Sequence, residues 1–258
     1  AMIAETTSIE LMVAAHPGII HPQLAAKMGA SLDRISGGRF AINVVNGWYQ
    51  KEFDVFGNGT WLDRTEERYC RMGEFMQVLK GLWCQERFDF DGDYFRLEDA
   101  VLPIKTLQMP NPPIYAASSA KQGMGQVARY ADAWFVGYEP GFDNAPQNIE
   151  RIARDVEHMR GLSAAYGRTL TFGISAHVIC TETRKEAVEL ARSLEAYGAR
   201  DRISLVAAKA LGAGLVGTPD DIAERLSALH QIGIDTSMVH FYPMLDGLET
   251  FAREVVPR

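Results

Sequence analysis

The sequence has few cysteines, no long apolar run and no cluster of basic residues. Its three cysteines, Cys70, Cys84 and Cys180, lack CxxC spacing, so neither a disulfide framework nor a zinc site is expected. No apolar segment reaches the roughly 18–20 residues that span a bilayer, and no signal peptide is visible. The net charge of -7 argues against a general nucleic-acid or anionic-membrane binder. We therefore expect a cytoplasmic protein without nucleic-acid, membrane or metal partners.

One short stretch combines a helix end, a buried strand and a polar residue inside it. Gly37-Gly38 predicts a helix end, because glycine tolerates the left-handed backbone that follows a helix. Residues 40–45 form an apolar run of strand length, as in a parallel strand covered on both faces. Asn43 lies inside this run, where an unpaired amide would cost about 1–3 kcal/mol. The sequence therefore predicts a hydrogen-bond partner for Asn43.

Strands and helices alternate along the rest of the chain. Strands are expected at 9–15, 40–45, 113–117, 133–138, 171–180 and 236–241. Helices are expected from Pro22 to Ile35, over 66–83, 120–130, 147–166 and 185–197, after Thr218-Pro219, and over 248–255. Between them, 47–63 is expected to be a long loop, and 85–112 an excursion with a small hairpin. Apolar residues recur at helical spacing on the first of these helices, at Leu24, Ala25, Met28, Leu32 and Ile35.

This order predicts an α/β fold with a parallel sheet and right-handed crossovers. The absence of a single glycine-rich dinucleotide fingerprint weakens a doubly wound interpretation and leaves an α/β barrel. A barrel needs eight strands and six are counted, so we expect the first one or two strand-helix units to be absent from this chain. Residues 1–4 are consistent with this, since they resemble the end of a helix. The alternative is an open six-stranded sheet with two exposed parallel edges.

Candidate functional residues follow the predicted strands, where barrel enzymes carry their chemistry. Ser118-Ser119 precedes a helix, and is either an anion site at its N-terminus or a simple cap. His16 follows the first strand and is either a proton donor or a packed, hydrogen-bonded residue. Trp48 and Tyr138 are candidates for the wall of a substrate pocket.

Several motifs, in order along nearly the whole chain, resemble the flavin-dependent luciferase-like monooxygenases. The similarity is greatest to the branch that oxidises alkanesulfonates, dimethyl sulfone and pyrimidines. The motifs are Ser36-Gly37-Gly38-Arg39-Phe40, residues 43–48 (NVVNGW), Glu67-Arg68-Tyr69 with Glu74-Phe75, residues 115–119 (YAASS), and residues 215–219 (LVGTP).

The resemblance implies a single (β/α)8 barrel domain over 1–258, lacking N-terminal strands and with insertions at about 47–64 and 85–112. It implies a monooxygenase that uses reduced FMN from a separate flavin reductase. One oxygen atom of dioxygen would pass, via a flavin peroxide, to a small organic substrate, with an organosulfur compound expected. A homodimer or homotetramer is also implied. Two alternatives stay open, a deazaflavin-dependent oxidoreductase and a non-catalytic flavin-binding protein.

The resemblance also implies roles for individual residues. Tyr69, Ser118 and Ser119 would hold the FMN phosphate, and Asn43 would hydrogen-bond the edge of the isoalloxazine. Val45 and Asn46 would line the ring. Trp48 and Tyr138 as pocket residues and His16 as the catalytic candidate rest on their positions in the sequence and not on the resemblance. Members of this branch have a histidine where this chain has Thr65, so a role of that histidine is not expected to carry over.

Overall fold

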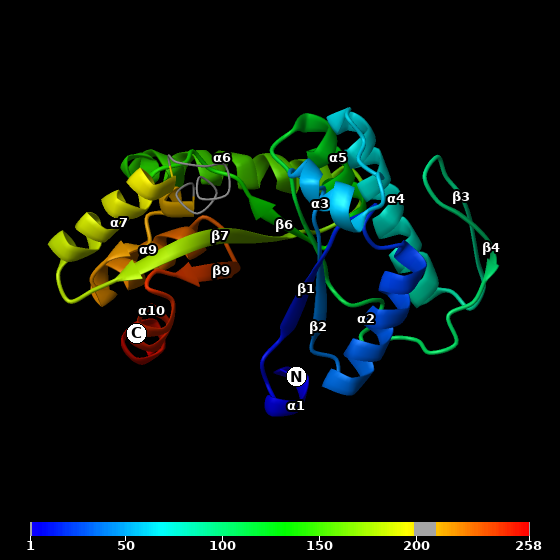
Figure 1. Ribbon diagram of the computed structural model, residues 1–258, viewed down its shortest axis with the longest axis horizontal. Helices are drawn as coiled ribbons and strands as arrows, with labels where there is room; N and C mark the ends of the chain where they lie inside the picture. The colour runs from blue at the N-terminus through cyan, green and yellow to red at the C-terminus, as the bar shows by residue number, and fades with distance from the viewer. Residues whose placement is uncertain (1, 199–209, 258) are drawn as a thin grey trace. The chain divides into compact units, whose positions relative to one another are not determined.

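The computed structural model describes residues 2–198 and 210–257 (Figure 1). Its residue contacts divide the chain into two compact units. The first comprises the residues up to 134 together with 162–170, and the second comprises 135–161 and the residues from 171 onward. That the whole chain forms a single barrel domain stays a prediction.

The first unit is built on parallel strands, each followed by a helix. β1 pairs in parallel with β2, and β2 pairs in parallel with β5. The register places Asn43 of β2 beside Ala14 of β1 and Tyr115 of β5. β3 and β4 form a separate antiparallel pair, which confirms the predicted hairpin. The elements are α1 (Met2–Glu5), β1 (Leu11–Ala15), α2 (Pro22–Ser36), β2 (Phe40–Val44), α3 (Gln50–Phe56), α4 (Thr65–Cys84), β3 (Phe88–Asp91), β4 (Arg96–Ala100), β5 (Ile114–Ala117) and α5 (Lys121–Tyr130).

The second unit repeats this pattern around its longest strand, β7. Both β8 and β9 pair with β7 in parallel. Parallel pairing and strand-helix alternation in both units confirm the predicted α/β class. The elements are β6 (Ala133–Val136) and α6 (Ala145–Ala164), which cross the unit boundary, η1 (Phe142–Asn144), β7 (Thr171–Cys180), α7 (Arg184–Gly198), η2 (Ala210–Ala213), β8 (Val216–Gly217), α9 (Pro219–Gln231), β9 (Thr236–Phe241), α10 (Met244–Thr250) and η3 (Phe251–Val255).

The predicted helix ends agree with the structure. Gly37 adopts φ 71° after α2, and its N–H donates to the Arg34 carbonyl at 3.2 Å. α9 begins at Pro219 behind a capping box, in which Thr218 and Asp221 exchange hydrogen bonds. α1 agrees with the helical residues expected over 1–4, of which the structure describes 2–4. None of the helices described in residues 2–198 and 210–257 is long and apolar enough to cross a membrane.

The segment predicted as a loop over 47–63 contains a helix, α3. α3 is held by one apolar side chain, Phe53, which is completely buried. Because the other α3 residues are mostly polar or exposed, the sequence shows no helical periodicity there. The two-residue strand β8 was also not predicted, and the last predicted helix, 248–255, starts earlier, at Met244, and ends in a π-turn.

Three of the five apolar positions predicted along α2 face solvent, whereas Ala25 is buried. Leu24, Met28 and Ile35 are 52%, 49% and 73% exposed, respectively. The buried face of α2 is instead made of small residues, among them Ala26 and Gly29. Gly29 lies against Phe40 and Trp83, whose rings leave no room for a larger side chain. Close packing of large rings therefore determines which face of α2 is buried.

Candidate active site

The carboxyl end of β2 presents two amide oxygens without hydrogen-bond partners. Asn43 is partly buried, and its Oδ1 atom is closed to solvent and accepts no hydrogen bond from the residues that the structure describes. The same holds for Oδ1 of Asn46, three residues later. Leaving a buried acceptor unsatisfied costs about 1–3 kcal/mol. The partner predicted for Asn43 is thus not a described protein group, and both oxygens are suited to a ligand that donates hydrogen bonds.

Ser118 and Tyr69 meet at the start of α5, although they are 49 positions apart in the sequence. A Cβ atom at Gly123 would overlap the Ser118 hydroxyl and lie 2.5 Å from Cε1 of Tyr69. The Ser118 Oγ atom accepts a hydrogen bond from the Ala120 N–H at 3.1 Å, so it caps the turn before the helix. Ser119 is exposed beside it. The hydroxyls of Ser118 and Ser119 at the N-terminus of a helix suit an anionic group such as a phosphate.

His16, at the end of β1, packs into the loop that follows β2. Its ring lies edge-on to Phe53 with 6.1 Å between centroids, and a Cβ atom at Gly47 would be 3.8 Å from its Nδ1. Gly47 has φ +84° and lies directly against Phe53, so no larger residue fits there. Burial lowers the pKa of His16, with the Glu52 carboxylate opposing, and the imidazole is therefore neutral at neutral pH. Its Nδ1 is buried and has no partner among the described residues.

Val45 and Trp48 lie on the same loop in different environments. The Val45 N–H donates to the Ala15 carbonyl at 2.9 Å and continues the β1–β2 ladder. Trp48 is 44% exposed, and its ring lies 5.6 Å from that of Tyr49. A role for either residue in lining a ligand stays a prediction.

Two buried arginines on α4, Arg68 and Arg71, were not predicted as site residues. Arg68 donates to the carbonyls of Leu62 and Asp63 and stacks 4.2 Å above the Trp61 ring. Arg71 donates from Nη1 to the Thr60 carbonyl at 2.7 Å. The signal in the sequence is a pair of arginines three residues apart on an otherwise apolar helix face.

The comparisons with known proteins identify the family. The sequence model of the luciferase-like monooxygenases matches residues 1–236. This chain belongs to the luciferase-like monooxygenase family. The resemblance inferred from the sequence motifs is thereby confirmed.

Two relatives carry the same name, FMNH2-dependent dimethylsulfone monooxygenase. The one from Pseudomonas putida is 33% identical, and the match covers 100% of this chain and 76% of the relative. The one from Pseudomonas fluorescens (strain Pf0-1) is 31% identical, and the match covers 100% of this chain and 75% of the relative.

Solved structures of a monooxygenase and of a dehydrogenase share the fold. A long-chain alkane monooxygenase superposes with a TM-score of 0.78 at 23% identity, over 99% of this chain and 70% of that chain. An F420-dependent secondary alcohol dehydrogenase superposes with a TM-score of 0.78 at 15% identity, over 98% of this chain and 81% of that chain. At these identities the likeness shows the fold alone.

Thr65, where the resemblance leads one to expect a histidine, contacts Arg68. Its Oγ1 accepts a hydrogen bond from Nη2 of Arg68 at 2.8 Å. Thr65 therefore holds Arg68 in place, together with the carbonyls of the preceding loop.

In this luciferase-like protein the hydroxyl of Tyr138, the predicted pocket residue of the second unit, is hydrogen-bonded to backbone carbonyls. The hydroxyl donates to the Ser175 carbonyl and lies 3.2 Å from the Ala210 carbonyl. Burial raises its pKa, so the hydroxyl stays protonated. The substrate-pocket role of Tyr138 stays a prediction.

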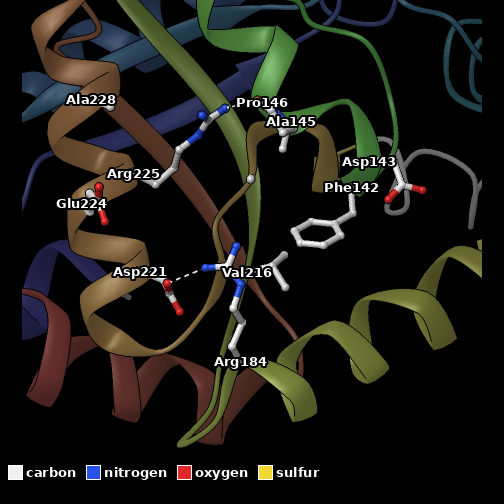
Figure 2. A pocket seen from close by; sticks show the side chains of 11 residues that line it. Phe142, Asp143, Ala145, Pro146, Arg184, Val216, Asp221, Glu224, Arg225 and Ala228 are labelled. Atoms are coloured by element: carbon white, nitrogen blue, oxygen red, sulfur yellow. Dashed lines mark hydrogen bonds and ion pairs between the residues drawn. The ribbon is translucent and has the colours of Figure 1, made fainter.

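The second unit also has a cavity of about 520 Å³, shown in Figure 2. Four of its charged side chains, those of Asp143, Arg184, Asp221 and Arg225, already have partners. Arg184 pairs with Asp221 at 2.7 Å, and Arg225 donates to the carbonyls of Ala213 and Ala145 at 2.8 and 2.6 Å. The unpaired polar atoms of the first unit therefore make the better candidate active site.

Proposed function

We propose that this protein is a reduced-FMN-dependent monooxygenase that inserts one oxygen atom of dioxygen into a small organosulfur compound. A separate flavin reductase would supply the reduced flavin. Membership of the family and the names of two relatives above 30% identity support this function. The structural observation that carries the proposal is the buried, unpartnered Oδ1 of Asn43 at a strand end.

The residues of the first unit fit FMN. Asn43 Oδ1 would accept a hydrogen bond from an N–H on the edge of the isoalloxazine, and Val45 and Asn46 would line the ring. Tyr69, Ser118 and the exposed Ser119 would hold the phosphate at the N-terminus of α5, where the helix dipole favours negative charge. Bound reduced flavin would supply the electrons for activating dioxygen.

His16 is the proposed proton-handling group. Its neutral imidazole can accept a proton at one nitrogen and donate one at the other. Phe53 and Gly47 fix the plane of its ring through direct packing. The buried, unpartnered Nδ1 leaves that atom available to a substrate or a water molecule.

The function is tested by turnover with reduced FMN, dioxygen and a panel of sulfones and sulfonates. We expect substrate-dependent consumption of dioxygen and loss of the organosulfur compound. Reduced deazaflavin serves as the control cofactor and should give no oxygenation. Tight binding of reduced FMN without oxygenation of any compound in the panel would contradict the proposal.

We further propose that the chain forms a homodimer or homotetramer through α2. The exposed stripe of Leu24 and Met28 borders a ridge formed by Lys27 and Ser31. Hollows of about 470 and 320 Å³ are both lined by this ridge. A ridge beside grooves on one helix suits a two-fold contact, in which each copy offers the same surface.

Light scattering after gel filtration tests the α2 contact. The double variant Leu24→Glu with Met28→Glu is expected to be monomeric. Val55→Glu is the matched control, because Val55 is 71% exposed on α3, outside this surface. A monomeric native protein, or a double variant with the native mass, would contradict the contact.

A further inference from the structure

Arg71 is a buried cation with unused hydrogen-bond donors. Its side chain is on α4 and only 6% of the residue is exposed. Nη1 donates to the Thr60 carbonyl, but Nε and Nη2 are closed to solvent and lack partners among the described residues. No ion pair to Arg71 is found in the part of the chain that the structure describes. Burial lowers its pKa, the nearby Tyr94 opposes this, and the like charge of Arg68 adds to it.

The two unused donors lie on the same edge of the guanidinium. The Nε–H and one Nη2–H of an arginine point in the same direction and form a fork. This fork matches two oxygen atoms bonded to a single sulfur, carbon or phosphorus atom. Arg71 therefore offers a two-pronged site, whereas its Nη1 is used to hold the loop.

The fork belongs to the cluster that contains His16. The Arg71 guanidinium carbon lies 5.8 Å from the Phe53 ring centroid, and Phe53 packs edge-on to His16. A Cβ atom at Gly18, two residues after His16, would lie 2.6 Å from that guanidinium carbon. Arg71 thus lies beneath the loops that follow β1 and β2, where ligands of parallel α/β sheets bind.

Thr60, whose carbonyl accepts the hydrogen bond from Arg71, lies in the turn formed by residues 57–60. In this turn Asn58 and Gly59 adopt positive φ angles of 49° and 77°, and Thr60 donates a hydrogen bond to the Gly18 carbonyl. Because the free donors are closed to solvent, a ligand would have to displace part of the surrounding loops, and this exposed turn, which Arg71 itself contacts, is the proposed point of entry. After entry, the turn would cover the ligand and exclude water.

We propose that the Nε–Nη2 edge of Arg71 binds the sulfonyl group of the substrate, gripping both oxygen atoms on one sulfur. Arg71 is then a specificity-determining residue that selects sulfones and sulfonates over sulfoxides, which carry a single oxygen on sulfur. The proposal rests on the proposed function, because the organosulfur class comes from there.

Arg68 provides a matched control on the same helix face. It is 9% exposed and lies one turn before Arg71. Its two terminal nitrogens are held by the carbonyls of Leu62 and Asp63 and by the Thr65 hydroxyl, and only its Nε lacks a partner. Replacing Arg68 therefore disturbs the same loop without removing a free fork.

The experiment measures binding of three small probes by calorimetry, with oxidised FMN present and without turnover. Dimethyl sulfone and dimethyl sulfoxide differ by one oxygen, and methanesulfonate adds a negative charge to the sulfonyl group. We expect the native protein to bind the sulfone at least roughly tenfold more tightly than the sulfoxide. In Arg71→Lys this ratio should fall to about one, since lysine keeps the charge but lacks the planar fork. Arg68→Gln should keep the native ratio.

Methanesulfonate tells a neutral ligand from an anionic one. If the buried charge also selects the ligand, methanesulfonate should bind more tightly than the sulfone, and Arg71→Gln should lose this excess whereas Arg71→Lys retains it. An unchanged sulfone-to-sulfoxide ratio in Arg71→Lys, or no sulfone binding to the native protein, would overturn the proposal. Fork-dependent binding without oxygenation would refute the proposed reaction and leave the sulfonyl site intact. Oxygenation of a compound in the panel, together with an unchanged sulfone-to-sulfoxide ratio in Arg71→Lys, would support the proposed reaction and refute the sulfonyl site at Arg71.

Discussion

Replacing Asn43 by leucine should have opposite effects on stability and on flavin binding. Asn43 Oδ1 is a buried acceptor without a partner in the part of the chain described here, so the unligated protein bears its desolvation cost. Leucine has a similar size and no polar atom. Removing the unsatisfied oxygen should therefore raise the free energy of unfolding by about 1–2 kcal/mol.

The same substitution should weaken FMN binding by about 0.5–1.5 kcal/mol, the usual contribution of one neutral hydrogen bond. Urea unfolding of the unligated protein measures the first effect, and fluorescence titration with FMN measures the second. Both measurements use the same preparation of the variant. A general loss of folding would lower both stability and FMN affinity, so it cannot give the expected rise in stability together with weaker FMN binding.

Asn111→Leu is the matched control. Its Nδ2 donates to the Pro112 carbonyl at 2.8 Å and to the Asp132 carboxylate at 3.0 Å. Losing these bonds should lower the stability of the unligated protein, by about 1–3 kcal/mol with the Asp132 carboxylate left short of a donor. If Asn43→Leu also destabilises the protein, or leaves FMN affinity unchanged, the idea that Asn43 awaits a flavin donor is refuted.

Three further predictions concern phosphate binding, the pH dependence of stability and the anchoring of α3. Tyr69→Phe with Ser118→Ala should weaken FMN binding by a few kcal/mol at most, and unchanged affinity in the titration would remove both from the phosphate site. The pKa of His16 is lowered in the folded protein, so the free energy of unfolding should fall as the pH drops below the ordinary histidine pKa of 6.5. The pKa of His177 is also lowered and adds to this fall. His16→Gln should therefore reduce the slope of stability against pH in urea unfolding. Phe53→Ala should cost about 3–5 kcal/mol in urea unfolding, and a loss below about 1 kcal/mol would show that α3 is not anchored by this ring.

The sequence was sufficient for features that depend on local chemistry. The Gly37 helix end, the hairpin within 85–112 and the strands around β2 follow from glycine conformation, turn residues and apolar runs. α3 could not be predicted because its single anchor, Phe53, is fixed by Gly47 and His16 from outside the helix. The exposed face of α2 was hidden for a similar reason, since the rings of Phe40 and Trp83 decide which side packs closely.

Sequence reasoning identified a residue of the candidate site only where the residue type and its neighbours required a hydrogen-bond partner. An amide inside an apolar run requires a partner wherever it lies, so Asn43 was identified from sequence. Arg71 was not, because its one signal in the sequence, the pairing with Arg68 on an otherwise apolar helix face, does not tell a buried arginine from a surface one. Only packing against Gly18 and the loss of solvent at Nε and Nη2 distinguish them.

The distribution of unpaired buried atoms supports a common ligand site in the first unit. Such atoms occur in seven of the described residues: His16, Asn43, Asn46, Arg68, Arg71, Arg168 and His177. Five of these lie between residues 16 and 71, on β2, on the strand-end loops and on the start of α4. Folded proteins pair most buried polar groups, so this concentration stores free energy that ligands can recover. Acceptors at Asn43 and Asn46 suit the N–H edge of a flavin, whereas the donors of Arg71 suit the oxygen atoms of a substrate. The opposite hydrogen-bonding character of the two groups argues for two ligands. The neutral His16 precedes both groups in the sequence and packs against the Phe53 ring, which Arg71 also approaches.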